Sequence, residues 1–338
     1  MKTFFVLPLL FVVLFISCAK KDIVENSETQ GYGWLVPTDK LVIHENAHDK
    51  IQSIDDPVFI SSRDASIASN EEVFVFQTQD QVRIYPVNVL WHHEIVNDRN
   101  GDDSFTVSFC PLTGSGIAWG WQSAANQETS FGVSGHLYNS NLVAYDRATE
   151  SYWSQMTLQG IKGPLGGEAL SRAYLLRTTY ATAIEAYPEA GVLFHSTDNG
   201  QCDSICPPQG GTHSGSGPYS FPANAYFGIV FRDEALLFDY QLFTDSVQLI
   251  RDRYKGNSFV VAGSKELGFV TAFSVPENIS LQPLNHQLPD IMADSDGNRY
   301  DIMGNVTSGP RKGQRLSAPL FYSANSFAWG LFFQVKFY

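Results

Sequence analysis

Residues 95–116 read IVNDRNGDDSFTVSFCPLTGSG and predict a β-hairpin that runs into a second, glycine-rich turn. The run SFTVSFC favours a strand, and the NGDD before it supplies residue types that tight turns prefer. A lone cysteine, Cys110, stands where that strand meets the Gly-rich turn. Eleven residues separate Asp98 from Cys110. The hairpin would therefore bring LWHHEIVND (90–98) beside FCPLTGSG (109–116).

A second stretch resembles the first and predicts an internal duplication. IVNDRNGDDSFTV (95–107) aligns with LIRDRYKGNSFVV (249–261), with five identities in thirteen positions. Further on, GPLGGEAL (163–170) aligns with GPRKGQRL (309–316) at Gly, Pro, Gly and Leu. Two matches in the same order indicate a repeated unit. In this alignment His93 is aligned with Val247 and Cys110 with Ser264. Any chemistry that uses His93 and Cys110 would therefore belong to the first copy.

Short strand signals dominate the rest of the chain. They are EVFVFQT (72–78), QVRIYPVNVL (81–90), GIAWGW (116–121), ETSFGVSG (128–135) and NLVAYD (141–146). The best helix signal is TTYATAIEAYPEAG (178–191), with a Thr at its start and Pro and Gly at its end. We therefore predict an α+β fold, predominantly antiparallel β, in which two related β-rich repeats pack as one domain and each is followed by a short helix.

The predicted boundaries divide the chain into five segments. These are a signal peptide (1–17), a flexible tether (18–33), the first repeat (34–195), a Gly/Ser/Pro-rich connection (196–222) and a second, degenerate repeat (223–338). The 338 residues are 43% hydrophobic and 17% charged, which suits a chain with a sizeable core. The formal net charge of −13, with no basic block, argues against nucleic acid as a partner.

The N-terminus predicts export and a lipid anchor. Lys2 precedes an apolar run from Phe4 to Ile16 that is too short to span a membrane and fits a signal peptide. The sequence FISC (15–18) then resembles a bacterial lipobox, which would make Cys18 the lipidated first residue of the mature protein. An ordinary signal peptide is the alternative. Ala19 after the cysteine favours the outer membrane of a Gram-negative envelope, and the lipid would be the only membrane contact.

The remaining cysteines number three, which is odd for an oxidising compartment. Cys202 and Cys206 lie in NGQCDSICPPQGG (199–211), where a local disulfide is the favoured prediction and a metal pair the alternative. That pairing would leave Cys110 as a free thiol.

Reactive residue types gather in three segments. Cys110, His93 and Asp98 are the candidate catalytic residues: an imidazolium beside the thiol would favour the thiolate, and backbone N–H groups of the Thr113–Gly116 turn would stabilise an oxyanion. The alternatives are a buried cysteine that acts as a small hydrophobe and a structural histidine. The candidate binding residues are Glu94, Asn97, Thr113, Ser115, Asn139, Asn141, Asp146, Arg147, Trp153 and Gln155; turn chemistry for the Asn pair and core packing for the aromatics are the competing interpretations.

Three of these motifs resemble an uncharacterised microbial family, domain of unknown function 3179. They are WHHEIVND (91–98), FCPLTGSG (109–116) and FGVSGHLYNSNLVAYDRATESYWSQ (131–155); DKIQSIDDPVF (49–59) and RIYP (83–86) also fit. The resemblance covers residues 34–195 strongly and the C-terminal half loosely, and it implies no established activity. The family pattern has Cys-Pro-Leu-Cys where this chain has Thr113 as the fourth residue, which argues against a two-cysteine mechanism. His92 stands where the family has Trp, so His93 is the family-position histidine.

Three function classes follow from these observations. The first is a cell-envelope enzyme that uses Cys110 and His93, and the second is a metal site built from the same pair, with copper as the soft-ligand candidate. The third is a non-catalytic binding or assembly lipoprotein whose motifs stabilise the fold. The residues identify no required cofactor, and they identify neither a ligand nor a protein partner.

Overall fold

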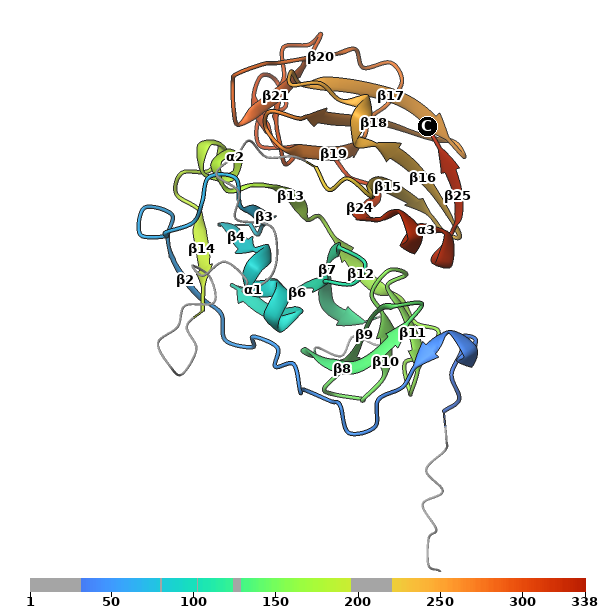
Figure 1. Ribbon diagram of the computed structural model, residues 1–338. Coiled ribbons are helices and arrows are strands. Elements are labelled where there is room, and N and C mark those ends of the chain that lie inside the picture. The colour runs from blue at the N-terminus through green and yellow to red at the C-terminus, as the bar shows by residue number, and fades with distance from the viewer. Residues whose placement is uncertain (1–31, 80, 102, 124–128, 196–220) are drawn as a thin grey trace, which may run out of the picture. The chain divides into compact units, whose positions relative to one another are not determined.

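The computed structural model describes residues 32–338, apart from 80, 102, 124–128 and 196–220. Gly33–Tyr338 forms one compact unit, built mostly from antiparallel sheets with three short α-helices among the described residues (Figure 1). The α+β, β-rich class is confirmed. Within the described part of the chain, no helix has the length and apolar character needed to cross a membrane.

The hairpin at residues 95–110 forms one side of a four-stranded sheet, with β5 at the edge. Strand β5 (Ile95–Asn100) pairs antiparallel with β6 (Asp103–Cys110), and Asn100 lies opposite Asp103 at the turn. β6 then pairs with β7 (Ser115–Ser123), whose first residue lies opposite Cys110. The fourth strand of this sheet, β12 (Leu170–Ala173), pairs with β7 and gives the order β12-β7-β6-β5.

A second antiparallel sheet follows along the chain. Its order is β1-β8-β9-β10-β11. The bounds are β1 (Leu41–Val42), β8 (Phe131–Tyr138), β9 (Asn141–Asp146), β10 (Tyr152–Ser154) and β11 (Gln159–Lys162). The 3₁₀-helix η1 (Thr38–Lys40) precedes β1.

A third sheet combines antiparallel strands with one parallel pair. Its order is β13-β3-β4-β14-β2, in which β14 runs parallel to β4. The bounds are β2 (Val58–Ser61), β3 (Glu72–Gln77), β4 (Val82–Pro86), β13 (Leu176–Thr179) and β14 (Gly191–Phe194). Helix α2 (Tyr180–Ala186) joins β13 to β14, and the Thr179 hydroxyl caps it by accepting the Thr182 N–H. The helix predicted over 178–191 is thus present but shorter.

Helix α1 (Val87–His93) replaces the end of a predicted strand. Residues 81–90 were expected to be extended throughout, but the strand ends at Pro86. Proline has no N–H to continue the sheet ladder, and its fixed φ suits a position at a helix start. The β-branched Val87 and Val89 favour a strand by propensity, yet both are buried in this helix instead.

The second half of the chain forms three further sheets, with orders β24-β15-β16-β25, β17-β18-β19 and β20-β21-β22-β23. The elements of the first are β15 (Ala225–Phe231), β16 (Glu234–Asp239), η2 (Tyr240–Leu242), β24 (Leu320–Asn325), α3 (Ser326–Phe332) and β25 (Gln334–Phe337). The other two sheets contain β17 (Gln248–Tyr254), β18 (Asn257–Ser264), β19 (Phe269–Ser274), β20 (Leu281–Pro283), β21 (Asp290–Asp294), β22 (Arg299–Asp301) and β23 (Val306–Ser308).

Two segments of the two halves have matching backbone hydrogen bonds. Gly160 N–H donates to Glu168 O at 2.8 Å, and Val306 N–H donates to Gln314 O at 2.8 Å. Leu170 N–H donates to Leu158 O, and Leu316 N–H donates to Gly304 O, both at 2.9 Å. Each donor or acceptor in the first half is separated from its counterpart in the second half by the same number of residues.

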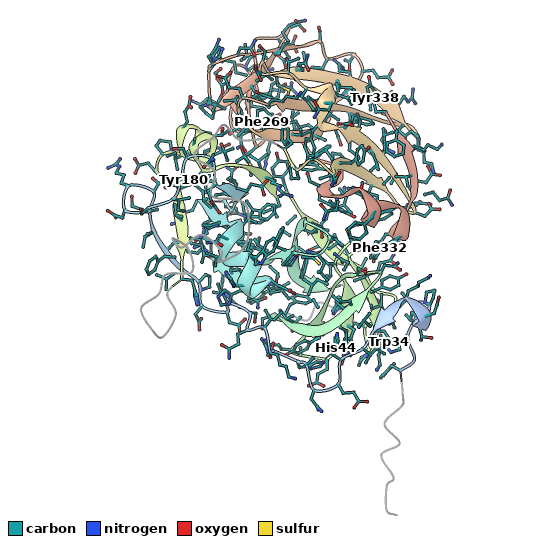
Figure 2. All side chains as sticks on the ribbon, in the orientation of Figure 1. Trp34, His44, Tyr180, Phe269, Phe332 and Tyr338 are labelled. Atoms are coloured by element: carbon teal, nitrogen blue, oxygen red, sulfur yellow. The ribbon has the colours of Figure 1, made fainter. Side chains whose placement is uncertain are left out.

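The core contains side chains from both halves of the chain. One cluster joins Val73 and Ile84 to Phe269 and Met292, and a second contains Trp119 together with aromatic residues of the second half. Tyr180 and Phe269, which Figure 2 labels, belong to the first cluster. This shared burial makes residues 33–338 one folding unit in physical terms.

Candidate functional site

The end of α1 holds Glu94 in an unusual backbone conformation. Its φ is 57° and its ψ is −31°, and its N–H donates to Leu90 O at 2.8 Å. Its carbonyl accepts the Phe109 N–H at 2.8 Å, which ties Glu94 to the strand that carries Cys110. Burial raises the pKa of the Glu94 carboxyl to about 7. A strained residue with a carboxyl that titrates near neutrality is typical of functional positions.

Cys110 is buried beside this carboxyl. Its exposed fraction is 2%, and burial raises the pKa of its thiol. Hydrogen bonds with Thr113 and with the Leu142 backbone act in the opposite direction, and the nearby Glu94 charge raises the pKa further. A nucleophilic thiolate needs the reverse, a lowered pKa. The thiol is therefore held in its neutral form by its surroundings.

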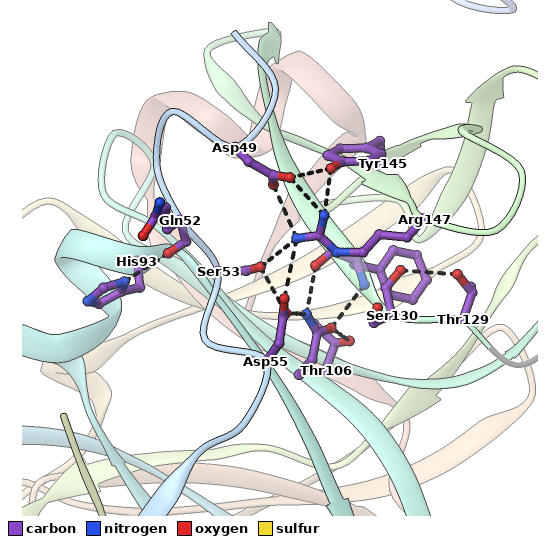
Figure 3. A network of polar contacts seen from close by, with 12 residues as sticks. Asp49, Gln52, Ser53, Asp55, His93, Thr106, Thr129, Ser130, Tyr145 and Arg147 are labelled. Atoms are coloured by element: carbon purple, nitrogen blue, oxygen red, sulfur yellow. Dashed lines mark hydrogen bonds and ion pairs between the residues drawn. The ribbon is translucent and has the colours of Figure 1, made fainter.

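His93 has different neighbours from the thiol. Its Nδ1 lies 2.8 Å from the Gln52 carbonyl oxygen, to which it donates (Figure 3), and its ring meets His195 edge-on with 4.4 Å between ring centroids. Cys110 instead contacts Thr113 and the Leu142 backbone. The contacts described for these two residues give no support to a paired thiol and imidazole.

Asp98 lies in a buried ion pair. Its carboxylate accepts hydrogen bonds from the Arg83 guanidinium, the Tyr85 hydroxyl and the Arg99 N–H, and its side chain is 1% exposed. The Arg83 guanidinium also stacks over the Phe59 ring at 4.4 Å. Burial, together with the Asp98 charge, holds the pKa of Tyr85 well above its ordinary value. These contacts make Asp98 a counter-ion in the core.

Four of the predicted binding residues form one buried polar network. The side-chain nitrogen Nδ2 of Asn141 donates to the hydroxyls of Thr113 (2.9 Å) and Ser115 (3.1 Å) and to the side-chain oxygen Oε1 of Gln155 (2.8 Å). Gln155 donates in turn to the Ser108 hydroxyl at 2.9 Å. All are at most 1% exposed. The network joins the Gly-rich turn after Cys110 to β9 and to the end of β10.

Arg147 and Asn97 belong to a second network, at the N-terminal segment 47–56. Arg147 donates to both Asp49 oxygens, at 2.7 and 3.2 Å (Figure 3). Asn97 donates to Asp55 at 2.6 Å and to Phe131 O at 2.7 Å. Burial alone would raise the Asp49 pKa, but hydrogen bonds from Arg147 and Tyr145 outweigh it and lower that pKa. The network fixes the segment against β5, β8 and the end of β9.

The other predicted binding residues also have structural partners. Trp153 donates from its indole N–H to Asp146 at 3.0 Å, inside the core. Asn139 has φ 50° in the turn between β8 and β9, and its amide donates to Leu331 O at 2.8 Å. Trp153 and Asp146 are thus core residues, whereas Asn139 lies in a turn that its amide links to Leu331.

The thirteen predicted catalytic and binding residues thus lie in several separate environments. Sequence reasoning missed the partners Ser108, Arg83, Tyr85, Asp49 and Asp55, because pairing of residues far apart in sequence has no local signal. Within the described part of the chain, no three His, Cys, Asp or Glu side chains are arranged to hold a metal ion. Cys18, Cys202 and Cys206 lie outside the described residues, so lipidation and the disulfide stay predictions. Copper binding at Cys110 and His93 also stays a prediction.

The geometry defines a β-rich α+β protein whose hallmark motifs meet at a buried thiol and an amide–hydroxyl network. Residues 48–335 match the model of the family described as "Protein of unknown function (DUF3179)". The chain belongs to that family, and the predicted resemblance is confirmed. Neither a curated protein nor a solved structure matches the chain.

Proposed function

We propose that this protein is a lipid-anchored, non-catalytic binding protein of the bacterial cell envelope, in which Cys110 has a structural role. The observation that carries the proposal is the burial of the Cys110 thiol. This burial also raises the pKa of the thiol. The surrounding residues support it, because Thr113, Ser115, Asn141 and Gln155 bond mainly to one another. Apart from the buried Asn141 Oδ1, which has no hydrogen-bond partner among the described residues, the polar groups of this network bond to one another, and such a network rigidifies a fold and offers few groups to a substrate.

Alkylation of Cys110 tests the structural role. The native protein should react with iodoacetamide at this position far more slowly than the unfolded protein does, since burial limits both access and ionisation. Peptide mapping after timed alkylation, with and without urea, separates Cys110 from the other cysteines. Alkylation of native Cys110 at the rate of an unfolded thiol would contradict the proposal.

A thiol-dependent enzyme is the second candidate, and Glu94 is the observation that favours it. A carboxyl with a pKa of about 7 is suited to general-base catalysis at neutral pH, and its charge acts on Cys110. In this version Glu94, not His93, would activate the thiol. Fast native alkylation that rises between about pH 6 and 8 in wild type but not in Glu94→Gln would favour this candidate over the first.

The anchor rests on the N-terminal sequence. Lys2, the apolar run and FISC (15–18) support lipidation at Cys18, and Ala19 supports the outer membrane. Metabolic labelling with a palmitate analogue should mark wild type and leave Cys18→Ala unlabelled, and the labelled protein should sediment with outer-membrane vesicles. Equal labelling of both forms would refute the anchor.

We also propose that the two halves arose by duplication. The order β13-β3-β4-β14 corresponds to β24-β15-β16-β25, and in each set a helix precedes the one parallel strand. The hydrogen bonds at residues 158–170 recur at 304–316. Trp153 donates to Asp146 as Tyr300 donates to Asp294. Cys110 lies at the end of β6 and Ser264 at the end of β18, which are equivalent positions under this proposal.

A further inference from the structure

Two adjoining hollows lie where the two halves of the chain meet. One has a volume of about 580 Å³ and includes Gln77 and Asp103 of the first half and Asn305 of the second. The other has a volume of about 250 Å³. They share Arg172 on β12 and Arg315, so the two arginines stand at the junction of the hollows. Clefts between packed units are a common place for ligand sites.

These two arginines differ from most others in the protein. Seven arginines form an ion pair with a carboxylate: Arg63, Arg83, Arg147, Arg177, Arg253, Arg299 and Arg311. Within the described residues, the side chain of Arg172 has no hydrogen bond or ion pair, and Arg315 has no carboxylate partner. In a chain of net charge −13, two guanidinium groups that form no ion pair thus line one hollow. Both side chains are exposed, so a ligand can reach them.

Arg315 is held in place by groups other than an acid. Its Nε donates to Met303 O at 3.1 Å, and its guanidinium lies 5.1 Å from the centre of the Tyr174 ring. Tyr174 is fixed in turn by hydrogen bonds to Thr271 (2.5 Å) and to Ile302 O (3.0 Å). The terminal nitrogens of Arg315 therefore remain as oriented donors, the arrangement that binds carboxylate or phosphate in a bidentate way.

Other groups in the larger hollow give it polarity. Asn305 donates to the side-chain oxygen Oε1 of Gln77 at 2.7 Å, which joins the two halves and leaves the side-chain nitrogen of Gln77 as a further donor. Asp103 carries the opposing charge, and it accepts the Gln79 N–H at 3.3 Å. A ligand anion would be attracted by the arginines and repelled by Asp103.

We infer that this hollow is a binding site for a small organic molecule that carries a carboxylate or phosphate group, held by Arg172 and Arg315. The inference names a ligand class for the binding protein proposed above and rests on that proposal. The carboxylate or phosphate accepts from the two guanidinium groups, and the Gln77 side-chain amide is an additional donor in the hollow.

The test is a calorimetric titration of the full chain in detergent with inorganic phosphate, citrate and glycerol 3-phosphate. At least one probe should bind saturably to wild type, and Arg172→Gln/Arg315→Gln should weaken that binding by about tenfold or more. The control Arg232→Gln/Arg253→Gln removes the same charge from exposed arginines outside the hollow and should stay within about twofold of wild type. Asp103→Asn should strengthen binding, because it removes a repelling charge.

The source of the anion is decided in a second arm. Cys18→Ala protein is mixed with vesicles of phosphatidylglycerol or, for comparison, of phosphatidylcholine. If the protein binds to the phosphatidylglycerol vesicles and this binding depends on Arg172 and Arg315, the site is assigned to a lipid headgroup rather than to a free anion. The inference is overturned when no probe and no vesicle binds saturably, or when the Arg172/Arg315 variant binds as wild type does. Neither result touches the anchor or the structural role of Cys110, which labelling and alkylation test separately.

Discussion

At the residue scale, Cys110 and Glu94 show how burial decides chemistry. The two side chains lie close together in the motif region, and burial raises both pKa values. A thiol under these conditions stays protonated, whereas a carboxyl with a pKa near 7 changes its charge at neutral pH. Of the two residues, it is Glu94 that responds to physiological pH.

The raised pKa of Glu94 predicts a pH dependence of stability. The folded-state value of about 7 lies above an unfolded value of about 4.3, so the folded state binds an extra proton between them. This contribution is full below about pH 4 and is lost as pH rises from there through about 7, by roughly 4 kcal/mol in total. Glu94→Gln should remove the loss. Urea unfolding from pH 5 to 8 measures it, with the exposed Glu45→Gln as control; parallel curves for wild type and Glu94→Gln would contradict the prediction.

The buried network predicts a large effect from one small substitution. Asn141→Ala removes the donor shared by Thr113, Ser115 and Gln155, which still bond to one another. Each buried hydrogen bond that is lost costs about 0.5–1.5 kcal/mol. We expect about 2 kcal/mol of lost stability by urea denaturation. The control is Asn224→Ala, whose side chain is exposed and which should change stability by less than about 0.5 kcal/mol. Equal effects of the two substitutions would show that the network contributes little.

At the scale of elements, two turns carry the same backbone requirement. Gly163 has φ 97° and Gly309 has φ 96°, and both lie in the left-handed region that disfavours side chains. A Cβ would meet the Cα of Ser151 at 2.7 Å in the first turn and the Cα of Asn298 at 2.7 Å in the second. The neighbouring backbone, which cannot move cheaply, leaves no room in either turn.

These turns make the proposed duplication testable. Gly163→Ala and Gly309→Ala should each destabilise the protein by about 2 kcal/mol or more, through strain and contact with backbone atoms. Gly33→Ala, with open space around it and no positive φ, serves as control. Thermal unfolding of the three variants provides the comparison. Loss of stability in only one of the two turns would show that their geometry is not shared.

At the scale of the whole molecule, contacts between the halves predict cooperative unfolding. Asn325 N–H donates to Thr113 O at 2.7 Å, and the Tyr322 hydroxyl donates to Met156 O at 2.8 Å inside a shared core cluster. Neither half can lose its structure without exposing apolar surface of the other. Hydrogen exchange across a urea series should therefore protect β6 and β18 over the same range of urea. Earlier exchange of one half would show that it unfolds alone.

The sequence alone determined the local features of this protein. Several strands of the first half, the hairpin at Asn100–Asp103, the β-rich class and the family followed from runs of apolar residues, turn residues and long motifs, all of which are local patterns. The helix at 87–93 was missed, because its valines favour strands and only the preceding Pro86 signalled a change.

The tertiary structure decided what the reactive residues contact. Asp98 pairs with Arg83, which lies fifteen positions earlier in the sequence, and His93 donates to the Gln52 carbonyl oxygen. Cys110 is buried and contacts Thr113. Arg172 and Arg315 are more than a hundred residues apart in the sequence but line the same hollow, and no sequence motif indicated this. Burial and pairing depend on which elements pack together, and packing is a property of the whole chain. Composition and spacing could therefore name the residues but not their pKa values or partners.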